Sequence, residues 1–92
     1  MEQPQALLAL AGLGQPLRLQ LFRMLIGHGA GGLSAGIIAE RLGVAPSSLS
    51  FHLTNLVEAG LITQTRSGRQ LIYAASPSTV RELQKYLGGL LR

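Results

Sequence analysis

The sequence contains no cysteine, no aspartate and no tryptophan. Without cysteine, the chain has no disulfide framework, no thiolate metal site and no catalytic thiol. Four scattered glutamates and two isolated histidines, His28 and His52, provide no spacing from which an acid/base pair, a nucleophile constellation or a metal site can be assembled. We therefore expect no enzyme activity, no metal and no cofactor. His28 should be an exposed loop residue, and His52 should pack and hydrogen-bond at a helix flank.

Long apolar runs and a signal peptide are also missing. No apolar run approaches the roughly 18 residues of a membrane span, and no basic segment precedes the Leu/Ala run at the N-terminus. We expect a cytoplasmic protein with no membrane partner. The glycine-rich segment Gly27–Gly32 lacks the lysine and the serine or threonine of a P-loop, so it favours a loop that ends a helix.

Length and composition indicate one domain, residues 1–92. The chain is 47% hydrophobic but has only two Phe and two Tyr, so its apolar content is mostly Leu and Ala and helices should dominate. Such a short chain buries a limited core, which favours dimerisation. Eight basic residues against four acidic ones favour an anionic partner such as nucleic acid, although a basic surface can equally be a solvated face.

Residues 34–59 show two helical patterns separated by a turn. Ser34 can cap a first helix, which should end at Gly43. Pro46 suits the first position of a second helix, which should end at about Ala59 before Gly60. This order is that of a helix-turn-helix.

The second of these helices has two distinct faces. An apolar stripe at i, i+4, i+7 and i+8 can pack on the preceding helices: Leu49, Leu53, Leu56 and Val57. Away from this stripe, or on its flanks, lie short and mostly uncharged side chains that suit contacts with phosphates and base edges: Ser47, Ser48, Ser50, Phe51, Thr54 and Asn55. Phe51 could meet a thymine methyl group or pack under the following hairpin; we favour the first. The sequence thus predicts a recognition helix.

Residues 61–75 alternate like two strands around a turn at Ser67 and Gly68. Arg66 and Arg69 flank that turn, where they could reach phosphates or an adjacent minor groove. An edge hairpin protected by its charges is the alternative. Because the hairpin directly follows the candidate recognition helix, we interpret it as a DNA-contacting wing.

Three further helices complete the prediction. The first covers Glu2 to Leu13, and its leucines must pack against the core or another subunit. The second begins at Pro16, and its Arg18 and Arg23 could be solvated or could contact phosphates. The last is capped by Ser76 and carries one apolar stripe, bordered by Tyr86, of Val80, Leu83, Leu87 and Leu90.

These motifs together resemble the ArsR/SmtB family of bacterial winged helix-turn-helix repressors. The resemblance rests on the helix-turn-helix, on Ser50, His52, Leu53 and Leu56, on the Ala-Gly-Leu-Ile sequence at 59–62, on Gly68, Arg69 and Tyr73, and on the segment 14–19. It implies a mainly α fold with a small β-hairpin, in the order four helices, two strands, one helix. It also implies a homodimer formed through the terminal helices, for which the candidate residues are Leu7, Leu8, Leu10, Leu83, Tyr86, Leu87 and Leu90.

The chain departs from the family at its sensor sites. It has neither the cysteine motif of metal-sensing relatives nor their acidic and histidine ligands along the last helix. It also resembles an arsenic-responsive group that carries cysteines just beyond that helix, whereas here the sequence stops at Arg92. Two alternatives stay open: a protein without this sensor, or a shortened or altered form of an arsenic-responsive repressor. No residue set for an inducer is evident.

The sequence therefore predicts a dimeric repressor that binds double-stranded DNA at an inverted-repeat operator. Specificity should come from the face of the recognition helix, and much of the affinity from Arg66 and Arg69. The alternative is a protein-interaction module that keeps the winged-helix fold and uses its leucine-rich terminal helices to join a larger assembly.

Overall fold

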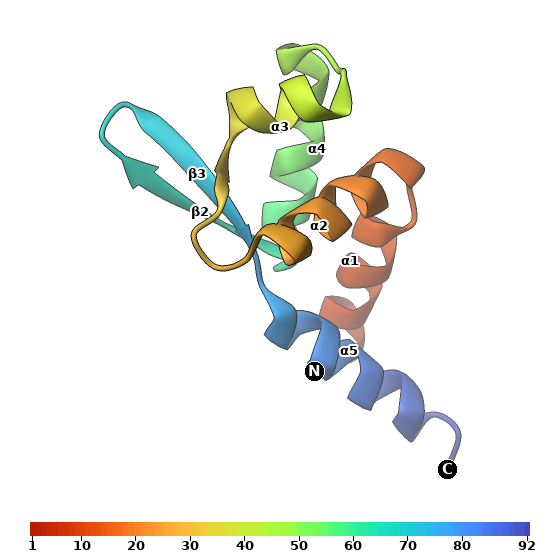
Figure 1. Ribbon diagram of the computed structural model, residues 1–92. Helices are drawn as coiled ribbons and strands as arrows, with labels where there is room; N and C mark the ends of the chain where they lie inside the picture. Colours follow the sequence, from red (N-terminus) through yellow and green to blue (C-terminus); the bar gives the residue numbers. More distant parts are fainter.

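The computed structural model describes residues 1–92 as five helices and three strands. Figure 1 labels all of these elements except the first strand. In chain order these are α1 (Gln3–Leu13), α2 (Pro16–His28), β1 (Leu33–Ser34), α3 (Ala35–Leu42), α4 (Pro46–Glu58), β2 (Ile62–Ser67), β3 (Gln70–Ala75) and α5 (Pro77–Gly89). The predicted winged helix-turn-helix order is confirmed, with one additional strand, β1, before α3.

The sheet has the strand order β1-β3-β2, and both pairings are antiparallel. Leu33 of β1 lies opposite Tyr73 of β3, while β2 and β3 pair along their full length. The sequence predicted only the hairpin, because a strand of two residues is too short to show alternation. The pairing of β1 with β3 connects the start of the helix-turn-helix to the wing.

A close approach at Gly32 allows β1 to pair with β3. Gly32 has a φ of +73°, and a Cβ at this position would lie 2.6 Å from the carbonyl oxygen of Tyr73. Any other residue would both clash and adopt a strained backbone. Just after it, Ser34 pairs with Ile72, and its Oγ accepts a hydrogen bond from the backbone N–H of Ile37 at 3.4 Å. Ser34 is thus both a strand residue and the predicted cap of α3.

The turn between α3 and α4 follows the predicted residues. Gly43 ends α3 in the left-handed conformation, with a φ of 67°. Pro46 begins α4, where its missing N–H leaves no intrahelical hydrogen bond unmade. These two residues fix the boundaries of the helices that form the helix-turn-helix.

Fifteen buried hydrophobic residues form a single core. The stripe predicted on α4 is confirmed, since Leu49, Leu53 and Leu56 are buried and Val57 is half-buried. The face of α1 that packs on this core consists of small residues: Ala6, Ala9 and Gly12. Because these side chains are small, α1 lies close to the core, while Leu7, Leu8 and Leu10 are exposed.

The molecule is elongated, with principal extents of 46 × 23 × 21 Å. In Figure 1, α1 and α5 lie together toward one end, and the β2–β3 hairpin projects away from the helical body. None of the helices combines the length and the apolar character that crossing a bilayer requires.

Candidate nucleic-acid interface

The face of α4 opposite its buried leucines is open to solvent. Ser47, Ser48, Ser50, Phe51 and Thr54 are exposed, and Asn55 is half-buried. Pro46 starts the helix immediately before the first two serines, so their hydroxyl groups lie in its first turn. Short polar side chains leave the helix backbone free to approach a groove wall closely.

Two of the polar side chains on this face hydrogen-bond to their own helix. The Thr54 hydroxyl donates to the carbonyl oxygen of Ser50 at 3.0 Å, and the Asn55 amide Nδ2 donates to that of Phe51 at 3.0 Å. These bonds fix the orientation of both side chains. The Asn55 amide oxygen and the lone pairs of the Thr54 hydroxyl are left to accept hydrogen bonds from a ligand.

Phe51 is the most unusual residue on this face, because its side chain is 64% exposed. It lies outside the core, and its ring meets the ring of His52 edge-on with 5.6 Å between centroids. The alternative that Phe51 packs under the hairpin as part of the core is therefore wrong. An exposed aromatic ring beside a row of hydroxyl groups offers an apolar contact to a partner.

The hairpin turn differs by one residue from the prediction. Ser67 still pairs with Gln70, so Gly68 and Arg69 are the two turn residues rather than Ser67 and Gly68. Gly68 has a φ of 63°, which suits the first central position of a type II′ turn. The correction places Arg69 at the tip itself, with exposed Arg66 further back on β2.

Arg18 has a role that the sequence did not reveal. Its Nε donates to the carbonyl oxygen of Gly12 at 2.9 Å and its Nη2 to that of Ala11 at 3.4 Å. Its Nη1 lies 3.3 Å from Nδ1 of His52 on α4. The predicted alternative of a solvated side chain is wrong, because the half-buried guanidinium joins the C-terminal end of α1 to α4, whereas a phosphate contact by Arg18 stays a prediction. Only long-range geometry could have shown this.

The predicted dimer residues fall into two groups. Leu7, Leu8, Leu10, Leu87 and Leu90 are exposed, with Leu90 at 65%, and Tyr86 is half-buried. Leu83 is only 6% exposed because it packs into the core of its own chain. We therefore omit Leu83 from the candidate dimer face, which keeps the other six residues.

The histidine and acidic side chains are scattered over the structure. No group of three or more His, Asp or Glu side chains converges in the structure. No polar or charged residue is buried, and His28 is exposed as predicted but is the last residue of α2 rather than part of the loop that follows.

The sequence matches one known family of protein domains. A family model described as a helix-turn-helix domain matches residues 13–65, more than half of the chain. No curated protein sequence matches the chain.

Three solved structures share the fold over most of the chain. An ArsR-like transcriptional regulator from Rhodococcus sp. RHA1 is 24% identical, with a TM-score of 0.83 over 95% of this chain and 79% of that one. HlyU from Vibrio cholerae N16961 is 25% identical, with a TM-score of 0.74 over 100% of both chains. A homodimeric winged helix-turn-helix DNA-binding domain from Mycobacterium bovis, Mb0332, is 22% identical, with a TM-score of 0.76 over 95% of this chain and 79% of that one.

Proposed function

This chain belongs to the helix-turn-helix domain family and is a winged helix-turn-helix transcriptional regulator of the ArsR/SmtB type, and on that premise we propose that it acts as a homodimeric repressor. The dimer would bind an inverted-repeat operator and block transcription by occupying it. No chemical step is required for this function. We place its action in the cytoplasm, where the DNA is.

The observation that carries this proposal is the exposed face of α4. The Phe51 ring is 64% exposed beside four exposed hydroxyl side chains, on a helix whose opposite side is buried in the core. This face contributes nothing to the core of the single chain, so its composition points to a partner. A helix of this kind fits the major groove of B-DNA, where base edges can be distinguished.

We assign two different tasks to the two parts of the surface. The α4 residues would read base edges and the thymine methyl group: Ser47, Ser48, Ser50, Phe51, Thr54 and Asn55. Arg66 and Arg69 on the wing would contact phosphates, which adds affinity without sequence preference. Substitutions on α4 should therefore change sequence specificity, whereas substitutions on the wing should change the salt dependence of binding.

Homodimerisation is supported by the leucines that α1 and α5 leave exposed. Leu7, Leu8 and Leu10 on α1 and Leu87 and Leu90 on α5 lie on helices that pack together in one chain. Pairing these faces between two copies would bury them and set two recognition helices about one DNA turn apart. The homodimeric state of the Mycobacterium bovis domain supports this arrangement.

Footprinting tests this proposal on the DNA upstream of the protein's own gene. We expect protection of an inverted repeat whose half-sites are about ten base pairs apart, centre to centre. Protection of a single half-site would contradict the dimer, and the absence of any protected sequence would contradict the operator.

A protein-interaction module is the competing function, and the same exposed leucines favour it. If α1 and α5 dock on a different protein, the chain should remain monomeric alone and bind operator and scrambled DNA equally. Selective DNA binding by a dimer would exclude this alternative.

A further inference from the structure

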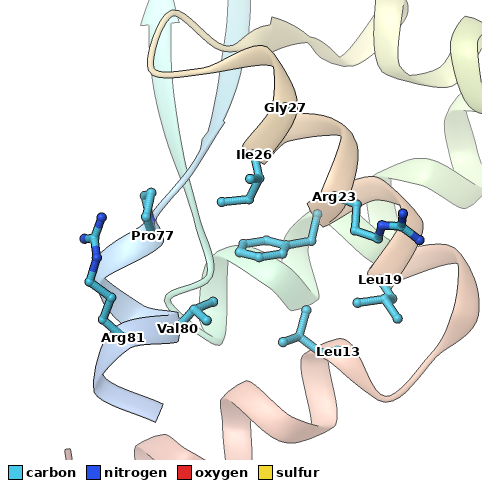
Figure 2. Close-up of a pocket in the computed structure, with 9 residues that line it drawn as sticks. Leu13, Leu19, Arg23, Ile26, Gly27, Pro77, Val80 and Arg81 are labelled. Atoms are coloured by element: carbon cyan, nitrogen blue, oxygen red, sulfur yellow. The ribbon is translucent and has the colours of Figure 1, made fainter. Parts of the chain in front are cut away.

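A hollow of about 600 Å³ opens between α2, the end of α1 and the start of α5 (Figure 2). This volume lies within the range of roughly 300–1,000 Å³ that small-molecule sites occupy. Its wall is almost entirely apolar and is formed by Leu13, Leu19, Phe22, Ile26, Pro77 and Val80. None of the candidate dimer residues lines it.

Two arginines supply the only charge of the hollow. Arg23 of α2 and Arg81 of α5 line it, and no acidic side chain does. Figure 2 shows these two side chains on opposite sides, with Ile26, Val80 and Leu13 between them. A guanidinium binds a carboxylate through two parallel hydrogen bonds, and such bonds are stronger than those between neutral groups.

The wall chemistry favours one class of ligand. Its side chains offer no hydrogen-bond acceptor, so the O–H donors of a sugar or nucleoside would find no side-chain partner on the wall. The positive charge of the two guanidinium groups at the rim disfavours a cation. An apolar body gains free energy in proportion to the area it buries against the wall, and one carboxylate at the rim would pair with Arg23 or Arg81.

We propose that this hollow is a binding site for an organic carboxylate with an apolar body, and that its occupation weakens operator binding. The second part rests on the proposed repressor function. A ligand bound between α2 and α5 displaces the helix-turn-helix relative to α5, which belongs to the proposed dimer face. Because one dimer geometry fits both half-sites, this displacement lowers the affinity for the operator.

Calorimetric titration of the full chain with octanoate, without DNA, tests the site. Octan-1-ol provides the same apolar body without charge, and acetate provides the charge without the body. We expect octanoate to bind one site per chain, octan-1-ol to bind more weakly and acetate not to bind. No octanoate binding, or equal binding of octanoate and octan-1-ol, would overturn the site.

Two double arginine variants test whether octanoate binds in the hollow. Arg23→Gln with Arg81→Gln should weaken octanoate binding about tenfold or more while leaving octan-1-ol binding unchanged. Arg41→Gln with Arg92→Gln removes the same charge from positions outside the hollow and should leave both affinities unchanged. Equal losses in the two double variants would show a general charge effect and overturn the assignment. Thermal melting checks that both variants are folded.

DNA binding is measured separately, so that the two proposals can fail independently. Saturating octanoate should lower the operator affinity of the unmodified chain and leave that of the Arg23→Gln, Arg81→Gln variant unchanged. Octanoate binding with unaltered operator affinity would overturn the effector role. If the unmodified chain shows no selective DNA binding without octanoate, that result contradicts the repressor function and not the octanoate site.

Discussion

The guanidinium of Arg18 approaches the recognition helix from α2, with its Nη1 3.3 Å from Nδ1 of His52. The same side chain donates hydrogen bonds to the carbonyl oxygens of Ala11 and Gly12 at the end of α1. One residue therefore connects three helices, and two of them are the proposed dimer helix α1 and the proposed DNA-reading helix α4.

Replacing Arg18 should destabilise the fold. Arg18→Ala leaves the carbonyl oxygen of Gly12 without its donor and removes the contact with His52, so we expect a loss of about 1–3 kcal/mol in the free energy of unfolding. Denaturant unfolding followed by circular dichroism measures this change. Arg23→Ala is the matched control, because Arg23 is exposed on the same helix, and it should change stability by less than about 0.5 kcal/mol. Equal losses in the two variants would contradict the structural role of Arg18.

Arg69 at the wing tip should govern the salt dependence of DNA binding. Arg69→Ala removes one phosphate contact, so affinity should fall for every sequence and the slope of log K against log salt should decrease by about 1. Arg92→Ala is the control: it removes the same charge at the other end of the molecule and should leave the slope unaltered. An unchanged slope in Arg69→Ala would show that the wing does not contact phosphates.

Polar residues on α4 should govern sequence discrimination. Ser48→Ala or Asn55→Ala should reduce the free-energy difference between operator and scrambled DNA by about 1–3 kcal/mol, while the salt slope stays the same. Ser78→Ala, on α5 away from this face, provides the control. Competition binding with both DNAs gives the difference. If these variants weaken binding to both DNAs equally, α4 does not read the bases.

Exposed leucines on the terminal helices should hold the dimer together. Leu8→Glu combined with Leu90→Glu places charges on the candidate dimer face without disturbing the core, because both side chains are largely exposed in the single chain. We expect sedimentation to show a folded monomer. Ile37→Glu, an equally drastic change of an exposed side chain on α3, should remain dimeric. A double variant that still sediments as a dimer would place the interface elsewhere.

Local sequence signals predicted most of the fold. Proline at the first position of α2, α4 and α5, Gly43 after α3 and the leucine period on α4 are each short-range features with a direct physical cause. The exposed serines of α4 follow from the same period, because buried leucines at one set of positions leave the others outside.

Features that depend on distant contacts could not be predicted in this way. The strand β1 exists because Gly32 permits a close approach to Tyr73, forty-one positions later in the chain. Leu83 and Leu87 share one helical stripe, yet only contact with the core shows that Leu83 is buried within its own chain. The Arg18 to His52 contact and the hollow beside Val80 likewise join segments far apart in the sequence.

Sequence-selective, salt-dependent DNA binding is the central claim, and fluorescence anisotropy tests it most directly. Purified protein is titrated against labelled DNA from upstream of its own gene and against a scrambled duplex, across a series of salt concentrations. We predict tighter binding to the upstream DNA at every concentration, and a decline with salt on both duplexes. Equal and weak binding to the two duplexes would contradict the repressor function and leave only a basic surface.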